Sequence, residues 1–293
     1  MTVEVARRHG LELRIEEVDE TGWDFRVRHG ADSQGRWWVL REPRRPEVSS
    51  RIPIEARVLE LLRPRLDVEL PRWEVCAPDL VAYRRLGGAP LADEDPVTLP
   101  YRWTGTAPDD YFGALGATIA ELHRVPIDAA AATGVAVRDD GECRAERAAE
   151  LADAQAELGV PGHARDRWRR WLDDERCWAG RPRLVHNDLS PNHTLVDETG
   201  ALRGILDWAD AAVDDPAQDF AAPYVAFGAD GLDRLLAAYD RAGGAPHERF
   251  REHVVLLAEF RYRVSLGLHG LRTGNDDYVA LARARLADPV LPE

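Results

Sequence analysis

The segment LVHNDLSPNHTLVD holds four side chains that can do chemistry: His186, Asp188, Asn192 and His193. Phosphoryl transfer to a hydroxyl needs a carboxylate that accepts or orients the hydroxyl proton, and oxygen or nitrogen ligands that hold Mg²⁺ against the phosphates. The signature H-x-D-x-x-x-x-N supplies the carboxylate and one ligand, and a second Asp follows at the end of a hairpin. Here Asp188 takes the position of the base, and the predicted strand pair HTLVDETGALRGILDW leads to Asp207 as the second Asp.

The same segment allows two other interpretations. A lone Asp188 in a turn before Pro191 is more often a capping residue than a catalyst. His186 and Asp188 also match the first half of the facial triad of a non-haem iron oxygenase, with His253 or His269 as the third ligand. Such an oxygenase has a β-jelly roll, whereas the chain after about residue 200 has helical periodicity.

The composition is that of a globular protein with an acidic balance. Of the 293 residues, 45% are hydrophobic and 31% are charged, and the formal net charge is −14. Nucleic-acid binding usually needs a positive surface, so we expect no nucleic-acid partner. No apolar run approaches the roughly 18 residues of a membrane span, so we expect a cytoplasmic protein that binds no membrane. Cys76, Cys143 and Cys177 are expected to be free, buried thiols.

The elements that must position these residues differ between the two ends of the chain. GWDFRVRH, with Trp23 and Phe25 in alternation, and GRWWVLRE predict an antiparallel strand pair. RIPIEARVLELLR predicts a helix with Pro53 in its first turn, and RWEVCAP and DLVAYRRL predict two more strands. These elements form a small N-terminal lobe at residues 1–86.

The segment GGAPLADEDPVTLP, residues 87–100, is rich in Gly, Pro and Asp and is predicted to be a hinge or linker. The remainder, residues 101–293, is mostly helical by its periodicity. Helices are predicted within DDYFGALGATIAELHRVP, at about residues 142–158 and 163–177, and in three segments after LDW. Two lobes with a cleft between them are a common place for a small-molecule site.

Three linked motifs, HNDLSPNH, LDWADA and DDPAQDF, make the chain resemble the aminoglycoside phosphotransferase superfamily of kinase-like enzymes. That pattern runs H-G-D-x-x-x-x-N, then I-D-W and D-P-x-x-D. His193 stands where the pattern has Asn, which is similar to the macrolide phosphotransferase branch, as are ETGWDFRV, WWVLREPRR and DLVAYRRLGGAP. The resemblance covers roughly residues 3–225. It implies a bilobal protein-kinase-like α+β fold with a small antiparallel sheet lobe that includes one helix.

The resemblance also implies an activity, the metal ion it needs and the substrates it acts on. We expect transfer of the γ-phosphate of GTP, or ATP, to the 2′-hydroxyl of the amino sugar of a macrolide antibiotic, which inactivates it. Asp188 orients the hydroxyl, and His193 with Asp207 holds Mg²⁺; Asn192 is an alternative ligand. The expected partners are a macrolide and a purine nucleotide, and the protein is expected to be a monomer. Another hydroxylated amine, such as an aminoglycoside or a choline-like molecule, is the alternative acceptor.

Several further residues are assigned by the same resemblance. The chain has no Lys, so Arg41 takes the place of the phosphate-binding Lys, with Glu55 as its ion-pair partner. Missing Lys and Asn leave an inactive binding module as an alternative, although Asp188 and Asp207 are intact. Asp219 is expected to bond to the catalytic loop. The nucleotide-binding residues are completed by Gly22, Ala82 and Arg84. The acidic balance and the position after Asp207, not the resemblance, lead us to expect that the acceptor contacts Asp210, Tyr224, Phe227, Phe260 and Tyr262; several of the aromatic residues could equally belong to the core.

Overall fold

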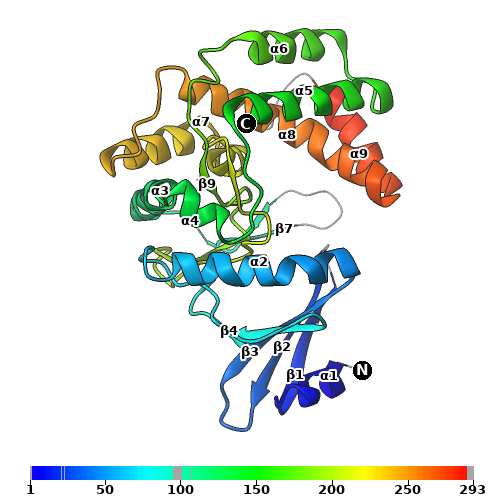
Figure 1. Cartoon of the computed structure of the whole chain (residues 1–293), viewed down its shortest axis with the longest axis vertical. Helices are drawn as coiled ribbons and strands as arrows, with labels where there is room; N and C mark the ends of the chain where they lie inside the picture. The colour runs from blue at the N-terminus through cyan, green and yellow to red at the C-terminus, as the bar shows by residue number, and fades with distance from the viewer. Residues whose placement is uncertain (1, 21, 23, 95–100, 106, 289–293) are drawn as a thin grey trace.

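The computed structural model describes residues 2–20, 22, 24–94, 101–105 and 107–288. Trp23 and residues 95–100, the second part of the predicted hinge, lie outside the described residues. Figure 1 shows a sheet-containing lobe at the bottom and a larger, mainly helical lobe at the top. The predicted α+β fold, with an N-terminal antiparallel sheet and a helical C-terminal part, is confirmed.

Five antiparallel strands form the sheet of the N-terminal lobe in the order β1-β2-β3-β5-β4. The strands are β1 (Leu13–Asp19), β2 (Phe25–Asp32), β3 (Trp37–Pro43), β4 (Trp73–Ala77) and β5 (Leu80–Arg84). Asp32 closes the predicted β2–β3 turn, because its carboxylate accepts hydrogen bonds from the backbone N–H groups of Gln34 (2.9 Å) and Arg36 (3.0 Å). Gly35 follows the turn with φ +76°, a conformation that glycine adopts without strain.

The two faces of this sheet are covered by different helices, because successive side chains of a strand point to opposite faces. Val39 and Tyr83 pack with Ile52 of α2 (Pro46–Leu62). Leu40 and Ala82 pack with Ala6 of α1 (Thr2–Arg8) on the opposite face. Arg41 of β3 therefore points to the α2 side, toward the other lobe.

Helix α2 begins earlier than the sequence predicted. Pro46, not Pro53, occupies the first turn, and Pro53 lies exposed inside the helix. Pro46 fits the first position because a helix has no acceptor for the N–H that proline lacks there. The predicted placement of Pro53 was therefore wrong, and α1 was not predicted.

The first part of the predicted hinge forms strands. β6 (Ala89–Pro90) pairs with β10 (Thr194–Val196), and β7 (Ala92–Glu94) pairs with β8 (Tyr101–Trp103). This segment is therefore attached to the C-terminal lobe by backbone pairing as well as by the chain itself. The division at residues 86 and 100 stays a prediction.

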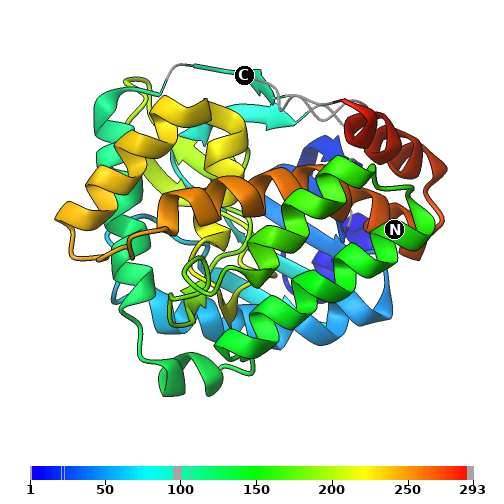
Figure 2. The same ribbon diagram turned by 90° about the horizontal axis from the view of Figure 1, so that it is seen from above.

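The C-terminal lobe is built from helices around short antiparallel ladders. Figure 2 shows α5 and α8 running side by side across this lobe. Its helices are α3 (Asp109–His123), α4 (Ile127–Ala131), α5 (Asp140–Glu157), α6 (Gly162–Asp173), α7 (Gln218–Arg241), α8 (Phe250–Thr273) and α9 (Asp276–Ala287). The helices expected after residue 101 are confirmed, whereas the short α4 was not predicted.

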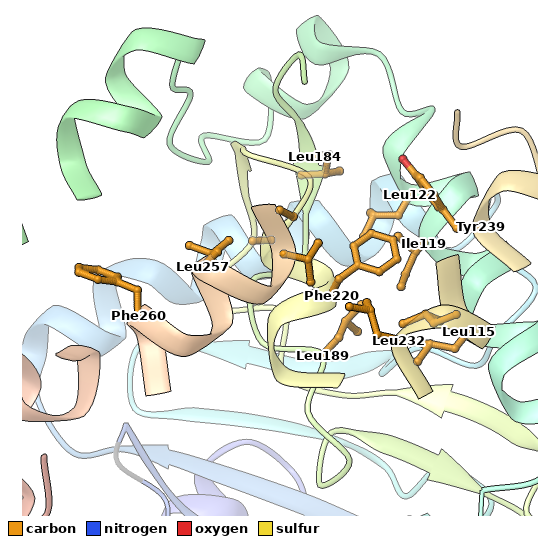
Figure 3. Close-up of a cluster of buried hydrophobic side chains, with 14 of the residues drawn as sticks. Leu115, Ile119, Leu122, Leu184, Leu189, Phe220, Leu232, Tyr239, Leu257 and Phe260 are labelled. Carbon is orange, nitrogen blue, oxygen red and sulfur yellow. The ribbon is translucent and has the colours of Figure 1, made fainter. Parts of the chain in front are cut away.

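The main hydrophobic core lies where α3, α7 and α8 meet (Figure 3). Leu115, Ile119 and Phe220 have no exposed surface, and Leu232 and Leu257 pack into the same cluster. Leu184, Leu189 and Trp208 belong to the same core, so it supports the segments around residues 188 and 207.

The described residues include three free cysteines that differ in burial. Cys143 and Cys177 are free and buried as predicted, but Cys76 is exposed because it lies on the outer strand β4. No helix in the described part of the chain is long and apolar enough to cross a membrane.

Close packing of α3 against α7 yields a test of the core. A Cβ added at Gly116 would lie 2.6 Å from the Ala238 Cβ and 2.8 Å from the backbone nitrogen of Tyr239. We expect Gly116→Ala to lower the free energy of unfolding by about 1–3 kcal/mol, because the helices must separate. Urea denaturation measures this change.

The same helix offers a matched control at Gly113, where an added Cβ meets nothing within 4 Å. Gly113→Ala should raise stability by up to about 1 kcal/mol through helix propensity alone. Equal effects of the two substitutions would contradict the packing of α3 on α7.

Candidate active site

Two loops of the C-terminal lobe carry the predicted catalytic residues. The first, residues 186–193, connects β9 (Arg183–Val185) to β10, and the second, residues 206–211, connects β11 (Leu202–Ile205) to β12 (Ala212–Asp214). β10 pairs with β11 and β9 pairs with β12, so both loops leave paired strands side by side. The pairing brings Asp188 and Asp207 together although 19 positions separate them in the sequence.

His186 joins the two loops. Its Nδ1 accepts a hydrogen bond from the backbone N–H of Asp188 (3.2 Å), so Nε2 carries the proton and donates to the carbonyl oxygen of Leu206 (2.8 Å). The ring is fully buried and packs against Trp208 with 4.5 Å between ring centroids. Burial lowers the pKa of His186, which keeps the ring neutral in this tautomer.

Asp219 holds the first loop from below. Its carboxylate accepts hydrogen bonds from the backbone N–H groups of His186 and Asn187, each at 2.9 Å. The side chain of Asp219 is fully buried and also contacts His123 Nε2 at 3.1 Å. The prediction that Asp219 bonds to the catalytic loop is confirmed.

His193 lies between the two aspartates. Its Nδ1 is 3.0 Å from the backbone oxygen of Asp188, which can only accept a hydrogen bond, so Nδ1 donates, and in the neutral ring Nε2 carries the lone pair. Nε2 faces Asp207 Oδ2 at 3.8 Å, and Nδ1 is 3.3 Å from Asp188 Oδ2. The three predicted residues therefore converge in one place.

Arg41 reaches the same place from the N-terminal lobe. One guanidinium nitrogen donates to Glu55 Oε1 (2.8 Å) and another to Asp207 Oδ1 (3.2 Å). The Arg41 side chain is only 8% exposed and lies over the Phe25 ring, 4.1 Å from its centroid. Burial raises the pKa of Glu55, although the charge of Arg41 acts in the opposite direction. For Arg41, burial lowers the pKa, but the neighbouring negative charges of Glu55 and Asp207 outweigh it, so the net pKa is raised. The ion pair predicted between Arg41 and Glu55 is present.

The residues here fit a divalent cation. Burial raises the pKa of Asp207, but the charge of Arg41, the two nearby imidazoles and a backbone hydrogen bond together outweigh it, so the net pKa is lowered and the carboxylate is ionised. Metal-binding imidazoles usually donate their other ring N–H to a carbonyl, as His193 does. The 3.8 Å between His193 and Asp207 lies within the roughly 3–4 Å between ligands of one octahedral cation. Asn192, the alternative ligand, has a buried Oδ1 that accepts no hydrogen bond from the described residues.

A cavity of about 390 Å³, lined by Asn187 of the first loop and Asp210 of the second, opens between α2 of the N-terminal lobe and α5 and α8. Ile54, Val135 and Ala136 give it apolar surface. Four arginines line it, namely Arg51, Arg138, Arg147 and Arg261. Four carboxylates balance their charge, namely Glu146, Glu150, Asp210 and Asp214. The volume falls within the roughly 300–1,000 Å³ of small-molecule sites.

Of the residues predicted to contact the acceptor, only Asp210 lines this cavity. Phe260 has no exposed surface and packs against Trp168 at 5.2 Å between ring centroids, so its prediction was wrong (Figure 3). Phe227 packs on Tyr111, Phe112 and Trp103, and Tyr262 lies under the Arg285 guanidinium. Neither of these nor Tyr224 lines the cavity.

The predicted base-recognition residues need correction as well. Ala82 is fully buried, and β5 pairs with β3 on one side and β4 on the other, so its backbone is inside the sheet. Arg84 stacks on Trp38 (4.0 Å) and donates to Glu74 (2.9 Å), away from α2. The chain leaves the sheet after Arg84, although Arg85 still donates its backbone N–H to the Trp37 carbonyl oxygen (3.0 Å).

Gly22 has a structural reason of its own. A Cβ there would lie 2.7 Å from the Phe25 carbonyl oxygen, and its own carbonyl accepts a hydrogen bond from Arg44 Nε (2.9 Å). Glycine is therefore required by close backbone approach, whatever its part in phosphate binding.

The iron-oxygenase alternative is contradicted by the structure. Both ring nitrogens of His186 are used within the protein, and His253 is buried between Asp215 and Trp171. Among the described residues no group of three His, Cys, Asp or Glu side chains is arranged to hold a metal ion by itself. A cation at His193 and Asp207 would therefore complete its shell with substrate and water oxygens.

Sequence reasoning missed Asn187, Arg51 and Arg261 at this site. Asn187 lies between His186 and Asp188 at a variable position of the motif, and the sequence does not indicate its φ of +75°. Arg51 and Arg261 lie on helices of different lobes, 210 positions apart, and no spacing rule connects them.

The chain is similar to known phosphotransferases over most of its length. A model of the "phosphotransferase enzyme family" matches residues 16–253. The uncharacterized protein YcbJ of Bacillus subtilis (strain 168) is 35% identical over 285 residues, which cover 96% of this chain and 93% of YcbJ. A solved macrolide 2′-phosphotransferase type I is 37% identical with a TM-score of 0.90, over 99% of this chain and 96% of that one.

Another similar structure is the apoenzyme of macrolide 2′-phosphotransferase MphH from Brachybacterium faecium. It is 36% identical with a TM-score of 0.87, and the match covers 99% of this chain and 97% of that one.

The buried pair of Arg41 and Glu55 yields a test of how the Arg41 charge is held. Glu55→Gln leaves the Arg41 charge with Asp207 alone, and removing one partner of a buried ion pair costs about 3 kcal/mol. We expect urea denaturation to show a loss of this size. Glu60→Gln, at an exposed position of the same helix, should change stability by less than about 0.5 kcal/mol. A loss as small for Glu55→Gln would rule out the buried pair.

Proposed function

The chain belongs to the phosphotransferase enzyme family, and from this premise we propose that it transfers the γ-phosphate of GTP or ATP to the 2′-hydroxyl of the amino sugar of a macrolide. The product is an inactivated antibiotic. The observation that carries the proposal is the convergence of Asp188, His193 and Asp207 opposite Arg41. Asn187 and Asp210, on the same two loops, line a cavity large enough for a sugar.

At the nucleotide end, Arg41 supplies a fixed positive charge to the phosphates. Its planar guanidinium can hold two oxygens at once, and Glu55 fixes its orientation. Asp207 and His193 would hold Mg²⁺, which when bound neutralises charge on the phosphates. The base would lie against residues 85–88. The resemblance to the macrolide branch favours GTP, with ATP as the alternative.

At the acceptor end, Asp188 does the proton chemistry. The acceptor hydroxyl oxygen forms the new bond to the γ-phosphorus, the bond to the β-phosphate oxygen breaks, and the nucleoside diphosphate leaves. The hydroxyl proton passes to the Asp188 carboxylate, which is 42% exposed and so accessible to a substrate. His186 and Asp219 keep the Asp188 backbone in place during this step.

Asp210 is the proposed contact for the dimethylammonium group beside the target hydroxyl. Its carboxylate is 64% exposed and lines the cavity, with Arg51 of the other lobe at 3.5 Å. The ammonium group of an acceptor can replace the Arg51 guanidinium as the positive charge beside the Asp210 carboxylate. The cavity is at the small end of the range for ligand sites, which suits the sugar, with the macrolide ring at the mouth.

A single experiment tests the reaction. The protein is incubated with Mg²⁺, GTP or ATP, and a panel of macrolides, aminoglycosides and choline, and products are identified by mass. We expect the mass of one phosphate to be added to macrolides that carry a free 2′-hydroxyl, and to no 2′-O-acylated macrolide. Phosphorylation of aminoglycosides or choline alone would overturn the macrolide assignment.

Removing the base separates chemistry from binding. Asp188→Asn should lower kcat by about 10²–10⁴-fold, because the proton acceptor is lost. Nucleotide affinity should stay within about threefold, since the substitution leaves Arg41 and Asp207 unchanged. Asp230→Asn, an exposed carboxylate of α7, serves as the control. Full turnover by Asp188→Asn would remove Asp188 from its role.

A further inference from the structure

Asn187 adopts a backbone conformation that non-glycine residues rarely take. Its φ is +75°, in the left-handed region that asparagine tolerates better than most side chains. Glycine would adopt the same conformation without strain. The presence of a side chain at residue 187 therefore needs an explanation beyond the path of the backbone.

The backbone of Asn187 is held by groups other than its own side chain. Its N–H donates to Asp219 Oδ1 (2.9 Å), and its carbonyl oxygen accepts from Arg261 Nη2 of α8 (3.1 Å). Arg261 is fixed in turn by Gln218 Oε1 at 2.6 Å. The loop that carries Asp188 is thus anchored by α7 and α8, so the Asn187 amide is not needed for that anchoring.

The Asn187 side chain instead contacts the acceptor site. Its Nδ2 donates to the backbone carbonyl oxygen of Asp210 (3.0 Å), and both residues line the cavity of about 390 Å³. This bond crosses from the loop of Asp188 to the loop of Asp210. It fixes the distance between the carboxylate that meets the hydroxyl and the carboxylate that meets the neighbouring amine.

We propose that Asn187 determines acceptor specificity by bracing Asp210 at a fixed distance from Asp188. This inference rests on the proposed function. The brace selects acceptors in which a cationic amine is next to the hydroxyl that receives phosphate. Asn187 is a positioning residue, since it acts through Asp210, and its loss weakens acceptor binding more than turnover.

The informative variant is Asn187→Gly, which removes the amide and relieves the backbone. We expect the acceptor KM to rise about 3–10-fold, the effect of losing one hydrogen bond. kcat and the nucleotide KM should stay within about twofold, because Asp219 and Arg261 still hold the loop. Ala245→Gly is the matched control, since Ala245 is exposed, has φ +50° and does not line the cavity.

A double-mutant cycle with Asp210→Asn shows whether Asn187 acts through Asp210. If it does, adding Asn187→Gly to Asp210→Asn raises the acceptor KM no further. Additive rises in the acceptor KM would overturn the brace, as would an unchanged acceptor KM in Asn187→Gly. A fall in kcat together with a fall in the free energy of unfolding in Asn187→Gly would also overturn it, because the residue would then be structural. Failure of the wild-type protein to phosphorylate any macrolide would instead overturn the proposed function together with the inference, so the two failures are distinguishable.

Discussion

The site depends on one constraint, the need to neutralise the buried charge of Arg41. A guanidinium that is 8% exposed is costly unless carboxylates surround it, and it finds one on α2 of its own lobe and one on the second loop of the other lobe. Because the planar group presents several N–H donors, it can contact Glu55 and Asp207 together. A lysine would present a single charged nitrogen to both. In this lysine-free chain, the same residue thus joins the two lobes and, in the proposed function, provides the positive charge for the phosphates.

Around that charge, the two catalytic loops hold unfavourable backbone conformations. Asn187 and Asp207 both have positive φ, at +75° and +59°. Such conformations persist where the surroundings over-determine them, and they are frequent at functional sites. Here His186 binds the loops to each other, and the fully buried carboxylate of Asp219 binds two backbone N–H groups of the first loop. The first loop, which carries Asp188, is therefore held in place by the buried residues His186 and Asp219.

How far the sequence could predict this site follows from the range of each rule. Linked motifs predicted that Asp188 and Asp207 would meet, and the resemblance to the family placed Arg41 beside them, because both depend on residue types at fixed spacing in the sequence. The acceptor residues failed for the opposite reason. A cavity is lined by whichever side chains of remote elements border it, and helical periodicity does not tell a core residue such as Phe260 from a cavity residue such as Arg261. Helix boundaries were also hard to predict: Pro46 and Pro53 could each occupy a first turn, and the sequence pattern did not show that α2 begins at Pro46.

The most direct measurement is the crystal structure of the protein with Mn²⁺ and a non-hydrolysable GTP analogue, with the cation located by its anomalous scattering. The account predicts one cation peak bonded to the Asp207 carboxylate and the His193 imidazole, with the γ-phosphate between Arg41 and Asp188. A cation bound away from these two side chains, or a nucleotide bound outside the crevice between the lobes, would contradict it.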